Sequence, residues 1–201
     1  MNTKCILFDA DGVVINSEMF SVQYQKRFGV SDDEMLPFFR GIFKDCLVGK
    51  ADLKEVVRPY LKDWKWTGTV DEFLQFWFKA EHHIDEKMIE LIKVLRGKNI
   101  KCFLATNQEK HRTEYMTNQM GFKDVFDHIF SSAEIGYKKP EREFYEFIFN
   151  WINKTESVAK EEIFYIDDSQ EAIDAANTYG INSRFYTSFE DFTNQINTLV
   201  K

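Results

Sequence analysis

The chain has 201 residues, a formal net charge of −7 at pH 7 and a hydrophobic content of 44%. This length suits one globular domain, or one domain with an insertion. The acidic balance disfavours a surface for nucleic acid or for an anionic membrane, and no apolar run approaches the roughly 18 residues of a membrane span.

The N-terminal stretch has no signal-peptide pattern, because Asp9 and Asp11 interrupt its apolar run early. The cysteines, Cys5, Cys46 and Cys102, are odd in number and have no CxxC spacing, which indicates reduced, structural thiols. We therefore expect a cytoplasmic protein without nucleic-acid or membrane partners, and a monomer by default.

Short, continuous apolar runs predict buried parallel strands, because strands covered on both faces lack polar alternation. The runs cover residues 4–9, 100–106, 128–131, 163–167 and 183–186. Helical patterns alternate with these strands and cover residues 86–96, 109–120, 140–151, 170–179 and 189–199. Strand alternating with helix predicts an α/β fold with a doubly wound, Rossmann-like parallel sheet.

A glycine and a proline indicate where two of the predicted helices end and begin. Gly97 supplies a C-terminal stop for the helix over 86–96. Pro140 suits the first turn of the helix over 140–151.

Residues 17–83 have no convincing strand but contain amphipathic segments at 18–28, 52–62 and 70–81. We interpret this stretch as a helical cap inserted after the first strand, over the carboxyl edge of the sheet. The predicted organisation is an α/β core formed by residues 1–16 and 84–201, and a helical cap formed by residues 17–83.

Polar residues follow four of the predicted strands, at the sheet edge where open α/β proteins bind ligands. Taken alone, each group has an ordinary explanation as a turn, a helix cap or a solvated lysine pair. Their recurrence at successive strand ends favours one functional site. The groups are Asp9-Ala10-Asp11-Gly12, Thr106-Asn107, Lys138-Lys139 and Asp167-Asp168-Ser169.

Four carboxylates in one pocket repel one another unless a cation joins them. Oxygen ligands favour a hard ion, and Mg²⁺ is the default choice. We expect Asp9 and Asp11 to tolerate each other because a metal ion and a lysine offset their charge. A metal ion, a lysine, a hydroxyl group and helix N-termini together predict a phosphate site.

These residues resemble the motifs of the haloacid dehalogenase superfamily, over essentially the whole chain. Asp9-x-Asp11-Gly12 is similar to the first motif, Thr106 to the second, Lys139-Pro140 to the third and Asp167-Asp168 to the fourth. A helical cap after the first motif resembles the subgroup that contains phosphoglycolate phosphatase, β-phosphoglucomutase and small sugar-phosphate phosphatases.

The resemblance implies a mechanism for each motif. Asp9 would attack phosphorus and form an aspartyl phosphate, and Asp11 would act as general acid and base. The Asp9 carboxylate, the Asp11 carbonyl group and Asp168 would hold Mg²⁺, with Asp167 as a further acidic ligand. The phosphoryl oxygens would be bound by Thr106, Asn107 and Lys139.

The presence of Asp11 favours phosphoryl chemistry over dehalogenation, because the dehalogenases of the family lack this aspartate. The segment "FFRGIFKDCL" resembles a mutase cap loop, in which Arg40 and Lys44 would contact the substrate. The alternative is that Arg40 ends a helix and Lys44 is solvated. Mutases of this group also carry a His soon after the first motif. This chain reads "NSEMFSVQ" there, without a His, which favours hydrolysis over a mutase reaction.

The resulting hypothesis is a Mg²⁺-dependent phosphatase that acts on a small phosphorylated metabolite, such as a sugar phosphate or phosphoglycolate. Two alternatives stay open. One is a sugar-phosphate mutase of the same family, and the other is a catalytically silent member that binds a phosphorylated ligand or a protein.

Overall fold

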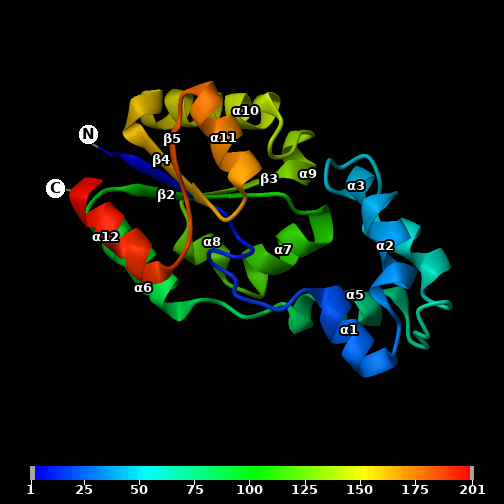
Figure 1. Ribbon diagram of the computed structural model, residues 1–201. Helices are drawn as coiled ribbons and strands as arrows, with labels where there is room; N and C mark the ends of the chain where they lie inside the picture. The colour runs from blue at the N-terminus through cyan, green and yellow to red at the C-terminus, as the bar shows by residue number, and fades with distance from the viewer. Residues whose placement is uncertain (1–2, 200–201) are drawn as a thin grey trace.

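The computed structural model describes residues 3–199 and contains a five-stranded sheet. All neighbouring strands are parallel, and the order is β3-β2-β1-β4-β5, as in a doubly wound sheet (Figure 1). The strands are β1 (Cys5–Phe8), β2 (Lys101–Thr106), β3 (His128–Ser131), β4 (Ile163–Asp167) and β5 (Asn182–Phe185).

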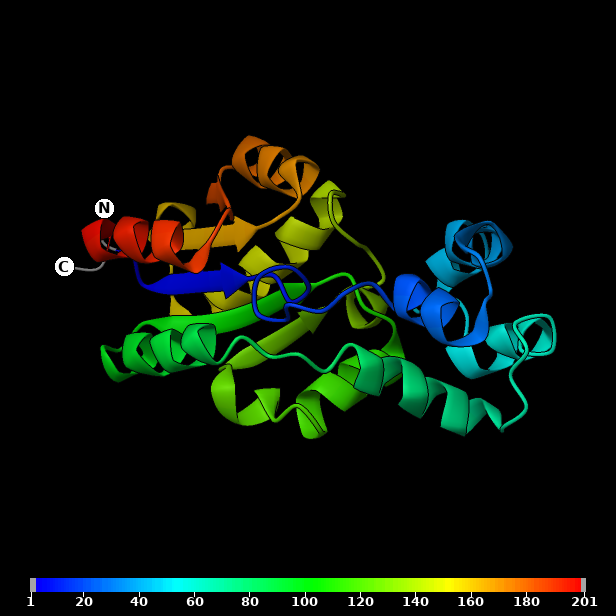
Figure 2. The ribbon, with the colours of Figure 1, turned by 60° about the horizontal axis from the view of Figure 1, so that its bottom comes forward.

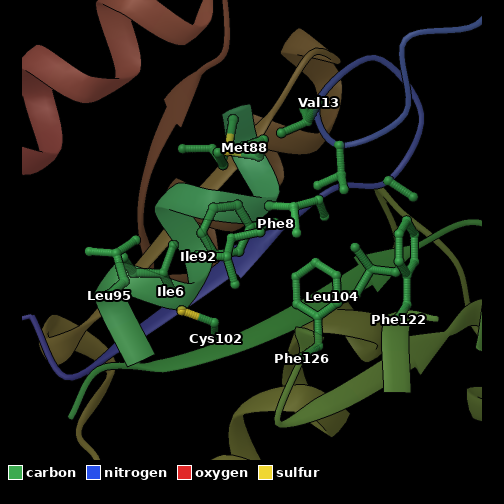
Figure 3. Close-up of a cluster of buried hydrophobic side chains, with 14 of the residues drawn as sticks. Ile6, Phe8, Val13, Met88, Ile92, Leu95, Cys102, Leu104, Phe122 and Phe126 are labelled. Carbon is green, nitrogen blue, oxygen red and sulfur yellow. The ribbon is translucent and has the colours of Figure 1, made fainter. Parts of the chain in front are cut away.

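Alternate residues of β1 pack on opposite faces of the sheet, as strand geometry requires. Ile6 and Phe8 join the apolar cluster that contains Ile92 of α6 (Figure 3). Cys5 and Leu7 join the cluster on the other face. The sheet is thus buried on both sides, which explains its continuous apolar strands.

Helices cover both faces of the sheet. Figure 1 shows α10 and α11 over one face, and α6, α8 and α12 over the other. The helices that follow β1 and the insertion are α6 (Glu86–Gly97), α7 (Lys110–Asn118), α8 (Phe122–Val125), α9 (Ser132–Ile135), α10 (Arg142–Glu156), α11 (Gln170–Tyr179) and α12 (Phe189–Leu199), with a 3₁₀ turn η2 (Lys160–Glu162) before β4.

The helical insertion, residues 17–83, lies beyond the carboxyl ends of the strands, at the right of Figure 2. Its helices enclose an aromatic-rich cluster of their own, which includes Phe20, Tyr24, Trp64 and Phe73. The elements are α1 (Phe20–Phe28), α2 (Asp32–Arg40), α3 (Phe43–Cys46), α4 (Leu53–Val57), η1 (Arg58–Tyr60) and α5 (Val70–Ala80).

Two adjacent segments connect the insertion to the sheet. The backbone N–H of Asn16 donates to the carbonyl of His83 at 2.8 Å, and Ile15 forms an antiparallel bridge with Ile84. The chain therefore leaves and re-enters the sheet region at one place.

Two details of the predicted helices are wrong. Helix α6 continues through Gly97, and the residue with left-handed backbone is Asn99 (φ 63°). Pro140 follows a cis peptide bond and precedes the helix, which begins at Arg142. A turn closed by a hydrogen bond of 2.8 Å, from the N–H of Glu141 to the carbonyl of Lys138, keeps Pro140 outside α10.

The three cysteines are free and buried, as predicted for structural thiols. Burial raises the pKa of Cys5 and Cys46 to about 12, so that neither is a ready thiolate. Within residues 3–199, none of the helices has the length and apolar character needed to cross a membrane.

Candidate active site

Three carboxylates meet at the carboxyl ends of the neighbouring strands β1 and β4. Asp9 follows β1, Asp167 ends β4 and Asp168 comes next. One oxygen from each lies within 4.8 Å of the others. Asp9 and Asp167 are buried, whereas Asp168 is exposed at the mouth. We call these three residues the carboxylate cluster.

Lys139 is the cation that faces this cluster. Its Nζ lies 2.6 Å from Oδ1 of Asp9 and 2.7 Å from Oδ2 of Asp167, and its side chain is buried. Burial alone would lower the pKa of Lys139, but the two carboxylates outweigh burial and raise that pKa above its ordinary value. Lys139 is therefore an ammonium ion that binds both buried aspartates.

Burial destabilises the ionised form of the Asp9 carboxylate. Burial raises the pKa of Asp9 to about 7, although Lys139 acts in the opposite direction. The carboxylate also accepts a hydrogen bond from the backbone N–H of Ala10, at 2.7 Å. Further positive charge next to Asp9 would therefore stabilise its ionised form.

Asp167 is held from several sides and so has a fixed orientation. The backbone N–H of Ser169 donates to its Oδ1 at 2.7 Å, and Tyr165 donates its hydroxyl proton to Oδ2. Ser169 is the N-cap of α11, so the first turn of that helix faces the cluster.

Thr106 is the last residue of β2 and Asn107 follows it, and both line the cavity that the carboxylate cluster also lines. The amide of Asn107 makes two hydrogen bonds with the backbone of Lys139, at 2.8 Å from its N–H and 3.0 Å to its carbonyl. Asn107 thus fixes the loop that carries Lys139, while Thr106 is 1% exposed at the cavity wall.

The Asp11 carboxylate lies outside the carboxylate cluster, although it is two residues from Asp9. Gln108 donates a hydrogen bond to its Oδ2, and a guanidinium nitrogen of Arg112 lies 3.5 Å from its Oδ1. We expected a lysine to offset both aspartates, but Lys139 pairs with Asp9 and Arg112 pairs with Asp11. Asp11 is offset by an amide and an arginine from the segment after β2.

Gly12 permits the close approach of Asp168. Its φ is +82°, and a Cβ atom built there would lie 2.0 Å from Oδ2 of Asp168. Only glycine satisfies both the left-handed backbone and this contact without strain. Gly12 therefore leaves room for the side chain of Asp168 in the carboxylate cluster.

The cluster, Lys139, Thr106 and Asn107 line one cavity of about 580 Å³. Arg40 and Lys44, which we expected to contact substrate, are not among the described residues that line it. Arg40 is the last residue of α2, and Lys44 lies in the short helix α3. Both residues are exposed, as in the alternative that Arg40 ends a helix and Lys44 is solvated.

The donor chemistry of the cluster fits Mg²⁺. Three carboxylates face a single ammonium group, which leaves two negative charges unbalanced when all three are ionised. Oxygen-only ligands in a pocket of this charge are typical of a hard divalent cation.

Arg112 and Glu81 extend the site toward the insertion, and the motifs did not reveal them. Arg112 is 3% exposed and forms an ion pair of 3.0 Å with Glu81, which also accepts a hydrogen bond from the N–H of Phe20. Burial raises the pKa of Glu81, and Arg112 counteracts this effect. The available sequence signal was a charged residue on the buried stripe of α7, four positions before Met116.

Comparison with known proteins identifies relatives of the chain. The family model described as haloacid dehalogenase-like hydrolase matches residues 6–185. A D-ribitol-5-phosphate phosphatase from Bacteroides thetaiotaomicron is 26% identical over 191 residues, which cover 90% of each chain. A sesquiterpene phosphatase from Aspergillus oryzae is 31% identical over 100 residues, which cover 48% of this chain and 47% of that protein.

A solved structure has the same fold. It is an HAD family enzyme from Bacteroides thetaiotaomicron in complex with magnesium and inorganic phosphate, and it superposes with a TM-score of 0.79. The identity is 20%, and the alignment covers 96% of this chain and 99% of that chain.

Proposed function

The chain belongs to the haloacid dehalogenase-like hydrolase family, and on that premise we propose that it is a Mg²⁺-dependent phosphatase of small phosphate monoesters. The observation that carries the proposal is the carboxylate cluster with Lys139 bound to both Asp9 and Asp167. The names of the two phosphatase relatives, and the magnesium and phosphate in the similar structure, support the same chemistry.

Asp9 is the proposed nucleophile. Its carboxylate attacks phosphorus to form an aspartyl phosphate, and the bond between phosphorus and the ester oxygen breaks. Lys139 stabilises negative charge on the phosphoryl oxygens, and Thr106 offers a hydroxyl donor. Mg²⁺, held by Asp9, Asp168 and the carbonyl group of Asp11 with Asp167 nearby, would supply charge neutralisation.

Asp11 is the proposed general acid and base. It gives its proton to the leaving alcohol and then takes a proton from the water that attacks the aspartyl phosphate. Gln108 and Arg112 hold its carboxylate at the cavity wall, so side-chain rotation must carry Asp11 to the leaving oxygen. We propose that the insertion, residues 17–83, covers the substrate during these steps.

The test is phosphate release from a panel of small phosphate monoesters, with and without Mg²⁺. We expect turnover that requires Mg²⁺ and falls by at least about a thousandfold in Asp9→Asn. Asp63→Asn, at an exposed aspartate of the insertion, is the matched control. Release that persists in Asp9→Asn would refute the proposed nucleophile. A folded, Mg²⁺-binding protein without phosphate release would favour a mutase or a silent binder, and sugar-phosphate isomerisation would separate those two.

A further inference from the structure

A second cavity lies beside the active site, within the insertion. It has a volume of about 140 Å³, which is enough for an apolar group of the size of benzene. Its walls come from the start of α1, one side of α2 and the end of α5. The apolar side chains that line it are Met19, Phe20, Met35, Leu36, Phe39 and Trp77.

Met19 lines both cavities and so lies between them. Met19 is 71% exposed, so it presents apolar surface to the solvent. A second connection runs through Glu81, which lines the apolar cavity and pairs with Arg112, the partner of Asp11. The guanidinium group of Arg112 thus lies between Glu81, in the wall of the apolar cavity, and Asp11, the proposed general acid.

Aromatic packing fixes the walls of this cavity. The ring of Phe20 stacks on Trp77 at 4.8 Å between centroids, and Phe39 meets Trp77 edge-on at 5.5 Å. The indole N–H of Trp77 also donates to Glu81 at 3.1 Å. The cavity is therefore held open by packed rings and needs little rearrangement to accept a ligand.

The charges around the cavity exclude a second anionic group on the ligand. Its polar lining residues are Ser21, Asp32 and Glu81, and no Lys, Arg or His occurs among the described residues of its wall. The nearby lysines, Lys138 and Lys139, line the other cavity. A carboxylate or second phosphate placed here would meet two acidic side chains and apolar rings.

We propose that this cavity binds the alcohol portion of the substrate, and that the preferred substrates are phosphate monoesters of uncharged, apolar alcohols. This inference rests on the proposed phosphatase function and narrows its substrate class. The phosphoryl group occupies the cavity of the carboxylate cluster, the carbon chain passes Met19, and its end packs against Trp77 and Phe39. Phosphoglycolate and sugar phosphates become poor substrates.

A series of n-alkyl phosphates from ethyl to hexyl tests the preference at constant charge. Each methylene group buried in an apolar pocket contributes up to about fourfold in kcat/KM, so hexyl phosphate should exceed ethyl phosphate by at least tenfold. Phosphoglycolate should fall below ethyl phosphate. A flat series, or a preference for phosphoglycolate, would overturn the inference.

A charge-inserting variant locates the effect. Leu36→Arg places a cation in the wall at a half-buried position of α2, and Val94→Arg is the control at an exposed position of α6. Leu36→Arg should lose most of the chain-length dependence and gain activity toward phosphoglycolate, whereas Val94→Arg should behave as the wild type. Equal dependence in both variants would place the alkyl chain elsewhere.

Binding separates failure of this inference from failure of the proposed function. Calorimetric titration of Mg²⁺-loaded Asp11→Asn with ethyl and hexyl phosphate needs no turnover, and this variant keeps the carboxylate cluster intact. Tighter binding of hexyl phosphate, lost with an added Leu36→Arg substitution, supports the cavity even if wild type releases no phosphate. Turnover of every ester with equal binding of both alkyl phosphates refutes the cavity and leaves the phosphatase intact.

Discussion

At the scale of single residues, the buried guanidinium of Arg112 connects Asp11 in the candidate active site with Glu81 in the insertion. Besides Asp11 and Glu81, it lies 3.4 Å from the carbonyl oxygen of Phe78 and over the ring of that residue. Its Nε and Nη2 have no hydrogen-bond partner among residues 3–199, so the ion pairs must offset the cost of burying the charge. Under the proposed function, Arg112 acts through Asp11 and is therefore a positioning residue.

Replacing Arg112 should reduce turnover more than it reduces binding. In Arg112→Met, Asp11 loses its cation and Glu81 becomes an unpaired buried carboxylate. We expect kcat to fall about 10- to 100-fold with a small change in KM, and Arg112→Lys to recover part of kcat. Steady-state kinetics, with the pH profile of kcat, measures this effect.

Arg96→Met is the control for a purely structural loss. Arg96 also bridges elements, through the carbonyls of Asp124 and Val125, but it lies away from the cavity. Its replacement should lower Tm and leave kcat unchanged. Equal losses of kcat in the Arg96 and Arg112 variants would contradict a positioning role.

At the scale of elements, the loop after β1 determines how closely Asp168 can approach Asp9 in the carboxylate cluster. The backbone turns back at once, with the N–H groups of Val14 and Ile15 both donating to the carbonyl of Ala10. This tight turn brings Gly12 under Asp168, where a side chain has no room. The loop and the start of α11 therefore form one unit.

Gly12→Ala should weaken Mg²⁺ binding by about tenfold or more, because Asp168 must move away from the added methyl group. Isothermal titration with Mg²⁺ measures the affinity. Gly121→Ala is the matched control, since Gly121 has a similar φ of +74° but open space around its Cβ position. Both variants should lose about 1 kcal/mol of stability from the left-handed backbone. A loss of Mg²⁺ affinity in both would show that strain, and not the contact with Asp168, is responsible.

The strands were predictable because burial on both faces leaves continuous apolar runs, and β3 and β4 have the expected bounds. Helix α2 was not among the predicted segments, since Pro37 lies inside it; a capping box of Ser31 and Glu34 starts it instead. The polar ends of β1, β2 and β4 were predictable from topology. The pairing of Arg112 with Glu81 was not, because it depends on how the insertion packs on α7.

At the scale of the whole molecule, the carboxylate cluster makes stability depend on pH and on metal. The pKa of Asp9 is raised to about 7, so the folded protein holds this proton more tightly than the unfolded chain does. Stability from this group is therefore greatest at low pH and is lost as pH rises from about 4 to about 7. A bound divalent cation would offset the loss, most fully above pH 7.

Thermal unfolding of wild type and Asp9→Asn tests this linkage. Without metal, Tm of wild type should fall from pH 5 to pH 8 by several degrees more than Tm of Asp9→Asn. Added Mg²⁺ should raise Tm of wild type more at pH 8 than at pH 5, and should raise Tm of Asp9→Asn little at either pH. Calcium-free buffers with a chelator define the metal-free state. Parallel pH profiles for both proteins would contradict the role of Asp9.

The two connecting segments at Asn16 and His83 also make the insertion exchangeable as a module. A hydrogen bond of 2.8 Å joins its ends, so a tight turn could replace everything between them with little change in loop-closure entropy. The buried residues of both sheet faces lie outside residues 17–83. Recombination between relatives can therefore exchange the insertion at this one place, provided that the new segment also supplies a carboxylate for Arg112.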